Sequence, residues 1–277
     1  MSRIERRFAA LHAEGRAGLV TYLTAGDPDP DTSARLFAGL PAAGADLIEI
    51  GMPFSDPMAD GPVIQEAGQR ALKHGMTLRR TLALVRDLHH SNDATPIILM
   101  GYYNPIYRYG PKGFAHDAVA AGVDGVIVVD LPPEEDAELT APARAPGLDF
   151  IRLATPTSDD HRLPEIVEHA SGFIYYAAVA GITGTRSAEA ADVAAAVARL
   201  RRFTDLPVAV GFGIRTSEQA AAVARAADAA VVGTALVQRL APNLNPDGTA
   251  KPGLIDAVLH DVRALGQGVR RARKTAA

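Results

Sequence analysis

The sequence contains no cysteine, and only four of its 277 residues are lysines. Without cysteine the chain has no disulfide, no thiol nucleophile and no cysteine-ligated metal. No apolar run reaches the ~18 residues that a membrane span needs, and the charged start Met1–Phe8 lacks the apolar core of a signal peptide. Because the net charge is −4, the composition does not indicate a nucleic-acid or anionic-membrane partner. We expect a soluble cytoplasmic protein.

What the chain does have is a regular alternation of short apolar runs with longer helical patterns. Each run is nearly all apolar, which is typical of parallel strands that are buried on both faces. Their spacing suits one strand and one helix per step. The eight runs are Leu19–Thr24, Leu47–Gly51, Ile97–Gly101, Gly125–Asp130, Phe150–Thr155, Phe173–Ala177, Val208–Gly211 and Ala229–Gly233.

Eight such units predict an α/β fold, a single (β/α)8 barrel over residues 1–277 with extra helices, including in the loop after the second strand. A doubly wound open sheet is the alternative. No Gly-x-Gly-x-x-Gly follows the first strand, which weighs against an open dinucleotide-binding sheet. We expect residues 266–277 to form a frayed basic tail. The expected helices include Thr32–Ala43, Leu78–His90, Pro133–Ala145, Ala188–Phe203, Ser217–Ala226 and Leu254–Leu265.

A single carboxylate interrupts the second apolar run. Because side chains alternate along a strand, Leu47, Glu49 and Gly51 share one face and the two isoleucines share the other. If the isoleucines face the helices, Glu49 faces the barrel interior near its C-terminal end, where barrel active sites lie. Burial there would raise the pKa of Glu49 and suit a group that transfers protons near neutrality. A structural ion pair would explain this residue equally well.

The loop after this strand contains three prolines between Pro53 and Pro62. Each proline fixes φ and stiffens the loop. A stiff loop can hold Asp60 in place as a second carboxylate, 11 residues after Glu49 in the sequence. From the loop alone, Asp56 and Asp60 are equally well explained as turn formers or helix N-caps.

Glycines mark the ends of the last two strands, at Gly211, Gly213 and Gly233, and Thr234 leads into a short helical pattern. Glycine lets the backbone approach a ligand closely, and a helix N-terminus presents N–H groups to an anion. The loops after strands seven and eight are the usual phosphate site of such barrels. We therefore predict a phosphate site here, with ordinary turns as the alternative.

Other kinds of catalytic group are missing from the strand ends. None of the four lysines falls at the end of a predicted strand, which argues against a Schiff-base aldolase. No cluster of histidines has metal-ligand spacing, so we expect no metal. Carbon–carbon cleavage here would need its electron sink inside the substrate. The segment Ala180–Ser187, rich in glycine and threonine, fits either a mobile lid or a simple exposed connection.

Taken in order, these segments resemble the tryptophan synthase alpha subunit family. The most specific is Leu47–Pro62, which is similar to the family's glutamate strand and proline-rich loop. The resemblance runs from about residue 5 to about residue 265. The other similar segments are Thr21–Pro28, Leu99–Pro105, Asp130–Pro132, Gly181–Gly184 and Gly211–Ile214.

The resemblance implies a lyase that cleaves indole-3-glycerol phosphate to indole and glyceraldehyde 3-phosphate. It implies that Glu49 is the acid/base and that Asp60 is the partner of the indole nitrogen. We expect the indole pocket and lid to include Tyr22, Met100, Tyr102, Ile127, Val129, Tyr175, Thr183 and Phe212. We expect phosphate contacts from Gly184, Gly211, Gly213, Gly233 and Thr234.

The resemblance also implies a partner, a beta subunit that carries pyridoxal phosphate in an α2β2 complex, and no cofactor in this chain. Asp56, Pro57 and Met58 lie on the same loop as Asp60, so docking there would couple to catalysis. The alternatives are a stand-alone indole-releasing lyase, another phosphate-binding barrel of the same pathway, and a non-catalytic binding partner. Loss of Glu49 or Asp60 would signal the last of these, and both are present.

The sequence departs from the family pattern at one residue and in two short segments. Thr234 stands where serine is usual, which keeps a hydroxyl. Ala226–Asp228 lacks a glycine that is common before the last strand. Ala177–Ala180 replaces a more polar exit from the sixth strand, which bears on hydrogen bonding of the lid and not on the chemistry.

Overall fold

The computed structural model describes residues 1–144, 147–178, 190–211 and 213–273. Within these ranges the strands form one parallel sheet. The strands are β1 (Gly18–Thr24), β2 (Leu47–Gly51), β3 (Ile97–Gly101), β4 (Gly125–Val128), β5 (Asp149–Phe150), β6 (Arg152–Ala154), β7 (Ile174–Ala177), β8 (Val208–Gly211) and β9 (Ala229–Val232).

The sheet closes on itself. Its strand order runs β5-β4-β3-β2-β1-β9-β8-β7-β6, and the two end strands are separated in sequence by Ile151 alone. The N–H of Ile151 donates to Val126 O at 3.0 Å, which continues the β4 ladder into this break. β5 and β6 are therefore the two halves of the predicted strand Phe150–Thr155, and the predicted eight-unit barrel is confirmed.

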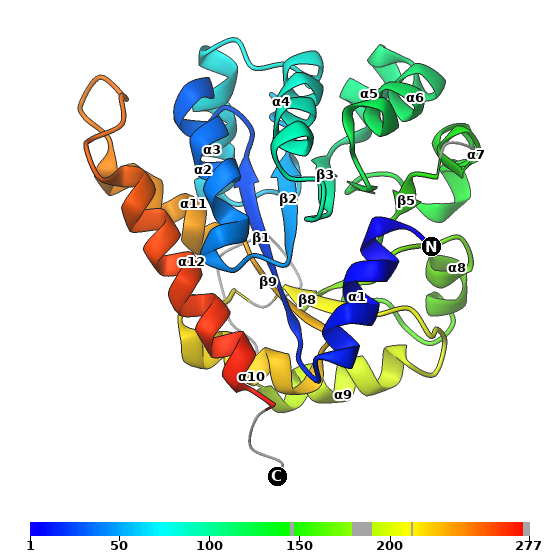
Figure 1. The fold of residues 1–277 in the computed structure, drawn as a ribbon. Coiled ribbons are helices and arrows are strands. Elements are labelled where there is room, and N and C mark those ends of the chain that lie inside the picture. The colour runs from blue at the N-terminus through cyan, green and yellow to red at the C-terminus, as the bar shows by residue number, and fades with distance from the viewer. Residues whose placement is uncertain (145–146, 179–189, 212, 274–277) are drawn as a thin grey trace.

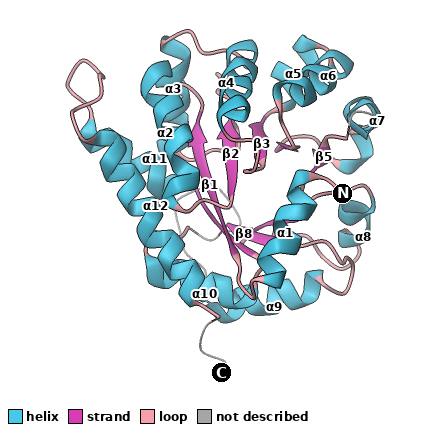
Figure 2. Ribbon diagram, in the orientation of Figure 1, coloured by secondary structure: helices cyan, strands magenta, loops and turns pink. Residues whose placement is uncertain are grey.

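Helices surround the strands on the outside (Figures 1 and 2). α3 and α4 both lie between β2 and β3, as expected for that long connection. The helices are α1 (Arg3–Ala13), α2 (Pro30–Ala43), α3 (Pro62–Lys73), α4 (Leu78–Ser91), α5 (Tyr103–Tyr109), α6 (Pro111–Ala121), α7 (Ala137–Arg144), α8 (Leu163–Glu168), α9 (Ala190–Leu200), α10 (Ser217–Ala226), α11 (Thr234–Leu240) and α12 (Leu254–Arg271), with 3-10 turns η1 (Pro133–Glu135) and η2 (Ala241–Asn243).

Two apolar cores lie on the two faces of the barrel wall. Ile48 and Ile50 belong to the larger core between the wall and the helices, whereas Leu47 belongs to the smaller core inside the barrel. The period-2 alternation predicted for β2 is therefore confirmed, and Glu49 is on the inner face with Leu47. Inner-face residues from the other strands include Val20, Ile98, Ile127, Ile151, Phe173, Ala209 and Val231.

Helix α1 closes the N-terminal end of the barrel. Ile4, Phe8 and Leu11 are buried in the inner core, and the Phe8 ring lies 5.6 Å from the Phe173 ring. A capping box at Ser2 begins this helix. The sequence shows the amphipathic charged start but did not predict that it would cover the barrel floor.

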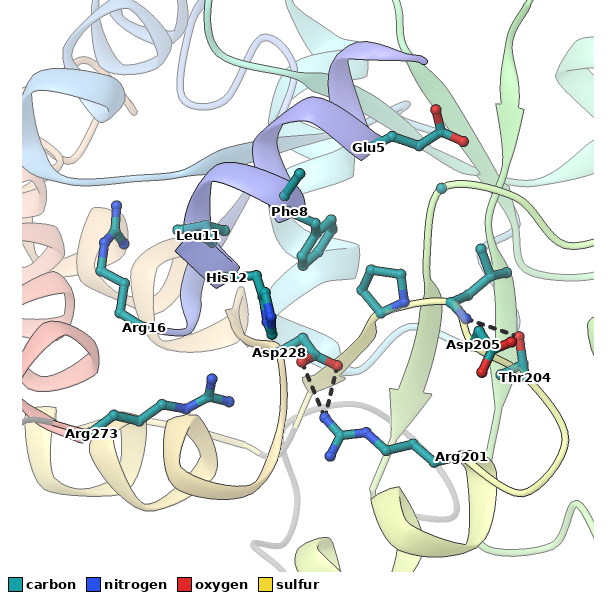
Figure 3. A pocket seen from close by; sticks show the side chains of 14 residues that line it. Glu5, Phe8, Leu11, His12, Arg16, Arg201, Thr204, Asp205, Asp228 and Arg273 are labelled. Carbon is teal, nitrogen blue, oxygen red and sulfur yellow. Dashed lines mark hydrogen bonds and ion pairs between the residues drawn. The ribbon is translucent and has the colours of Figure 1, made fainter. Parts of the chain in front are cut away.

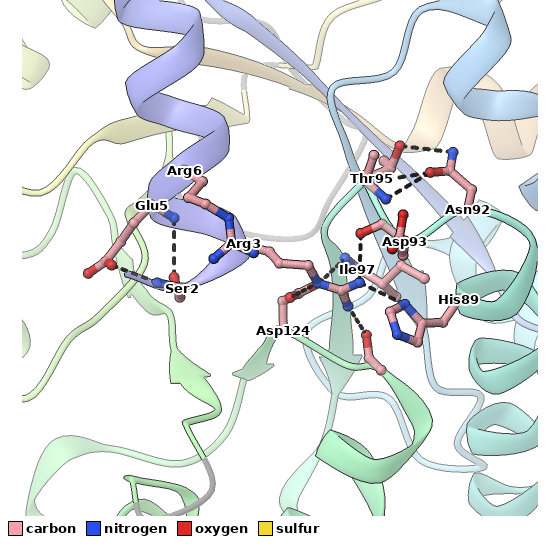
Figure 4. A network of polar contacts seen from close by, with 12 residues as sticks. Ser2, Arg3, Glu5, Arg6, His89, Asn92, Asp93, Thr95, Ile97 and Asp124 are labelled. Carbon is pink, nitrogen blue, oxygen red and sulfur yellow. Dashed lines mark hydrogen bonds and ion pairs between the residues drawn. The ribbon is translucent and has the colours of Figure 1, made fainter.

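Aspartates at the strand starts hold neighbouring strands in register at this same end. Asp46 accepts from the Leu19 N–H, and Asp124 accepts from the Ile97 N–H, both at 2.8 Å. The Arg3 guanidinium bonds Asp124 at 2.5 Å and contacts His89 Nδ1 at 2.7 Å, so it ties α1 to the wall and to α4 (Figure 4). These charge-assisted bonds pair carboxylates that would otherwise be buried alone.

A cavity of about 470 Å³ lies beside α1 on this floor (Figure 3). Positive and negative side chains share its lining, and Arg201 is paired with Asp228 at 3.1 Å. Its charged lining residues are Glu5, Arg16, Arg201, Asp205, Asp228 and Arg273. Because three are acidic and three are basic, the lining carries no net preference for an anion or a cation.

The chain end differs from the expected frayed tail. α12 continues to Arg271, six residues beyond the predicted end at Leu265. Val269 is buried, and Arg273 donates to the carbonyls of Ala224 at 3.0 Å and Ala227 at 2.7 Å. The basic side chains lie at a helix C-terminus, where the helix dipole favours them, so the cluster of positive charge does not end the helix.

Candidate active site

Glu49 occupies the inner face of β2, a strand in which every residue is buried. Its exposure is 0%, and among the described residues neither carboxylate oxygen has a hydrogen-bond partner. Burial alone raises the pKa of Glu49 to about 8. The structural ion pair that the sequence left open is therefore not formed within the described residues. Burying a carboxyl group without a partner lowers the stability of the fold.

Two tyrosines lie beside Glu49. Tyr22 is directly opposite Glu49 in the β1–β2 ladder, and its hydroxyl lies 3.4 Å from Thr24 Oγ1. Burial raises the pKa of Tyr22, and the charges of Asp60 and Glu49 raise it further. Burial and then the charge of Glu49 raise the pKa of Tyr175. Both phenols therefore stay protonated at neutral pH.

Glycine makes room for these rings. A Cβ on Gly51 would lie 2.2 Å from Tyr22 Oη, and a Cβ on Gly211 would lie 2.5 Å from Tyr175 Oη. Real Cβ atoms do not approach so closely, so any larger residue at either strand end would displace a tyrosine. Gly211, which we predicted as a phosphate contact, has at least this packing reason to be glycine.

Asp60 lies in the loop between β2 and α3. Tyr102 holds this loop, because its hydroxyl accepts from the Ala59 N–H at 3.1 Å. Gln65 Nε2 donates to the Asp60 carbonyl at 2.8 Å. Burial raises the pKa of Asp60 to about 6, and a hydrogen bond from Tyr102 opposes that rise. Since the charges of both Asp60 and Glu49 act on Tyr22, the structure brings the two predicted carboxylates to one end of the barrel.

An apolar surface surrounds Glu49 inside the barrel. Met100, Ile127 and Val129, all predicted to line an indole pocket, belong to the inner core or pack against it. Leu153 was not predicted, although it lies opposite Tyr175 in the β6–β7 ladder on the same inner surface. Alternation within Phe150–Thr155 could have shown it, since Ile151 and Leu153 share one face.

The predicted phosphate residues follow β8 and β9. Gly213 has a φ of +67°, which favours glycine. Gly233 is the N-cap of α11, and a Cβ there would lie 3.2 Å from Tyr22 Cβ. Thr234 is the first residue of α11, so the predicted helix start is confirmed. Three predicted site residues, Thr183, Gly184 and Phe212, lie outside the described residues.

The described residues contain no group of His, Cys, Asp and Glu side chains that could hold a metal ion. Among these same residues, no helix is both long and apolar enough to cross a membrane.

Comparison with known proteins shows which family the chain belongs to. The model of the tryptophan synthase alpha chain family matches residues 8–255. The chain is similar to tryptophan synthase subunit alpha from Legionella pneumophila, with 38% identity and a TM-score of 0.89 over 98% of this chain and 99% of that one. It is also similar to tryptophan synthase from Mycobacterium tuberculosis, with 37% identity and a TM-score of 0.88 over 97% of this chain and 98% of that one. The chain therefore belongs to the tryptophan synthase alpha chain family, the lyases that cleave indole-3-glycerol phosphate in tryptophan biosynthesis.

Proposed function

We propose that Glu49 and Asp60 carry out the cleavage of indole-3-glycerol phosphate to indole and glyceraldehyde 3-phosphate. The observation that carries this assignment is Glu49 itself. Its carboxyl group is fully buried, faces the barrel interior and has no partner among the described residues. Such a group lowers the stability of the fold and makes no structural contact in exchange. A role in the reaction explains why it is there.

The two carboxyl groups suit different steps. With a pKa of about 8, Glu49 holds a proton at neutral pH and can donate it to C3 of the indole ring. With a pKa of about 6, Asp60 is mainly ionised and can accept a hydrogen bond from N1–H as the ring becomes a cation. The glutamate, now ionised, then removes the proton of the neighbouring side-chain hydroxyl. The C–C bond breaks, its electron pair returns to the ring, and indole and an aldehyde leave.

The inner apolar surface gives this ring its place. We propose that the ring lies among the apolar and aromatic side chains around Glu49, which exclude water and favour a flat apolar ligand. The residues of this pocket and its lid are Tyr22, Met100, Tyr102, Ile127, Val129, Tyr175, Thr183 and Phe212.

The phosphate of the substrate would bind at the ends of β8 and β9. The positive φ of Gly213 and the start of α11 at Thr234 support this position, because glycine lets a ligand approach the backbone and the first N–H groups of a helix can donate to an anion. The proposed contacts are Gly184, Gly211, Gly213, Gly233 and Thr234.

We further propose that pyridoxal phosphate belongs to the partner beta subunit. A pyridoxal site needs a lysine for its Schiff base. Lys73 ends α3, Lys112 is in α6, and Lys251 follows the loop after η2, where its Nζ donates to the Pro242 carbonyl. None of these three lysines is on the inner face of a strand.

The beta subunit would dock, in an α2β2 complex, on the loop that contains Asp56, Pro57 and Met58. Met58 is 77% exposed and Tyr107 in α5 is 60% exposed, so two large apolar side chains stand in solvent. Tyr102 connects them, since it is the N-cap of α5 and bonds the Ala59 N–H next to Met58. Large apolar side chains exposed at the same end of the barrel, after β2 and after β3, favour a protein partner.

Indole release tests the proposed reaction. We expect the purified chain to release indole from indole-3-glycerol phosphate and to act on the dephosphorylated compound at least about ten-fold less efficiently, because the phosphate contacts are lost. Equal efficiency with both compounds would contradict the phosphate site. No indole from either compound, with or without the beta subunit, would contradict the proposed reaction.

A further inference from the structure

The barrel wall is not continuous between β4 and β6. β4 pairs with β5 at Gly125 and Val126, and β6 pairs with β7. The hydrogen bond from the Ile151 N–H to Val126 O is the last that joins β4 to the fifth strand among the described residues. Beyond it, toward the C-terminal end of the barrel, no backbone hydrogen bond among the described residues joins β4 to β6.

A cavity of about 400 Å³ lies in this opening. Val129, Ile151 and Leu153 line it, and these residues belong to the inner surface of the barrel. Val128 and Ile166 also line it, and they belong to the outer core. Residues from both faces of the wall therefore line one cavity, which lies at this break and reaches Ile166 of α8.

Arg152 lies along this passage and is only 4% exposed. Its guanidinium pairs with Asp136, donates weakly to Leu131 O at 3.4 Å and lies 4.4 Å from the centre of the Phe150 ring. Among the described residues, neither its Nε nor its Nη2 makes a hydrogen bond. A buried N–H without an acceptor is costly, so a ligand atom that accepts from it would be favoured.

The charges around the cavity decide what kind of acceptor fits. Arg152 is already paired with Asp136, and Arg162 at the outer end is paired with Glu134 and Glu165. Asp130 lies in the lining beside the two arginines, whereas the carboxylates that pair with the arginines lie next to the lining. Because each arginine already has a carboxylate partner, a carboxylate or phosphate ligand would compete with that partner, whereas a neutral ether, hydroxyl or carbonyl oxygen would not.

We propose that this cavity is a subsite of the indole pocket that accepts indoles with a neutral substituent on the six-membered ring. An oxygen in that substituent accepts from Arg152 Nε. This inference rests on the proposed function, because Val129 is shared between the subsite and the proposed indole pocket. A pocket without such an extension excludes an added group of this size.

The absence of tryptophan from the chain makes the binding measurement direct, since indole fluorescence can be excited apart from tyrosine. We would titrate the full chain with indole and with the four methoxyindoles substituted on the six-membered ring. At least one methoxyindole should bind within about three-fold of indole. The ethylindole of the same position should bind about three- to ten-fold more weakly than the methoxyindole, because it lacks the acceptor.

Two variants separate the subsite from a general effect. Ile166→Phe narrows the cavity. It should weaken the binding of the accepted methoxyindole about ten-fold and leave the affinity for indole unchanged. Val167→Phe, one position along α8 and outside the cavity lining, is its control and should change neither. Replacing the buried pair together, Arg152→Met with Asp136→Leu, should remove the preference for methoxy over ethyl.

The contradicting results are distinct. If every methoxyindole binds more than about ten-fold more weakly than indole, the subsite does not exist. The subsite would also be overturned if Ile166→Phe weakened the binding of indole and methoxyindole equally, or weakened the binding of neither. A methoxy preference that survives in the double variant would overturn the role of Arg152. If indole itself does not bind, the proposed function fails and not the subsite alone.

Discussion

Glu49 and Asp60 show how two residues with the same functional group acquire different protonation states. Glu49 is buried on a strand without a partner, whereas Asp60 is on a loop beside the Tyr102 hydroxyl. Their pKa values of about 8 and about 6 lie on the two sides of neutrality. Between those values the glutamic acid keeps its proton while the aspartate is charged, which is the combination that the proposed reaction needs.

The pH dependence of kcat/KM should therefore be bell-shaped, with its maximum between about 6 and about 8. Activity should fall above the pKa of Glu49, because the acid is then ionised. The substrate phosphate also titrates near pH ~6, so the alkaline limb is the sharper test. Asp60→Asn should bind substrate but lose most of kcat, while its alkaline limb stays. An activity that rises steadily through pH ~8 would contradict the role of Glu49 as the acid.

The same pKa predicts a conflict between activity and stability. The folded state holds the Glu49 proton more tightly than the unfolded state, whose pKa is near 4.5, so stability falls as pH rises from that value through about 8. Glu49→Gln has no proton to lose. At pH ~9 its free energy of unfolding should exceed that of the parent by an amount on the order of a few kcal/mol. At pH ~5 the two free energies should be much closer. Urea unfolding at the two pH values measures this, and a gain that does not grow with pH would contradict it.

At the scale of elements, the sequence predicted best where one periodicity decided the structure. β2, β3, β8 and α10 have the predicted bounds, because a short apolar run or an amphipathic stretch between capping residues left no competing structure. The break at Ile151 was not predictable, since it depends on how the fifth strand pairs with neighbours on both sides. The role of α1 as the barrel floor and the full length of α12 likewise depend on tertiary packing.

The end of β2 provides a test at this scale. A methyl group on Gly51 would meet Tyr22 Oη at 2.2 Å, so Gly51→Ala should displace Tyr22, lower stability by about 1–3 kcal/mol and reduce kcat/KM. Gly68→Ala in α3 is the matched control, because its Cβ would meet nothing closer than 3.9 Å. That variant should keep its activity and be as stable as the parent or more so by up to about 1 kcal/mol. If the two variants behave alike, the close approach at Gly51 has no consequence for the site.

For the whole molecule, the C-terminal end of the barrel gathers both the candidate site and the exposed side chains Met58 and Tyr107. The sequence predicted the loop residue Met58 as a docking position but not Tyr107, whose exposure follows from how α5 packs. Only Ala59 lies between Met58 and the site residue Asp60, and Tyr102 is bonded to this loop. A partner that fixes the loop would therefore also fix Asp60.

Adding the cognate beta subunit should raise the rate of indole release by one decade or more, about 1.4 kcal/mol per decade. Pro57→Gly, which loosens the loop, should reduce this activation more than it reduces the basal rate. The measurement is the ratio of the rate with saturating beta subunit to the rate without it, for the parent chain and for the variant. An unchanged rate on addition of the partner to the parent chain would indicate a stand-alone lyase.

The role of Glu49 is tested most simply by the rate of indole release from indole-3-glycerol phosphate by Glu49→Gln compared with the parent chain. Glutamine keeps the size of the side chain but cannot give and take a proton at this position. We expect a folded variant that binds substrate and whose kcat is lower by at least about 10²–10⁴-fold. A folded variant that retains more than about a tenth of the parent kcat would contradict the assignment of Glu49 as the proton-transferring residue.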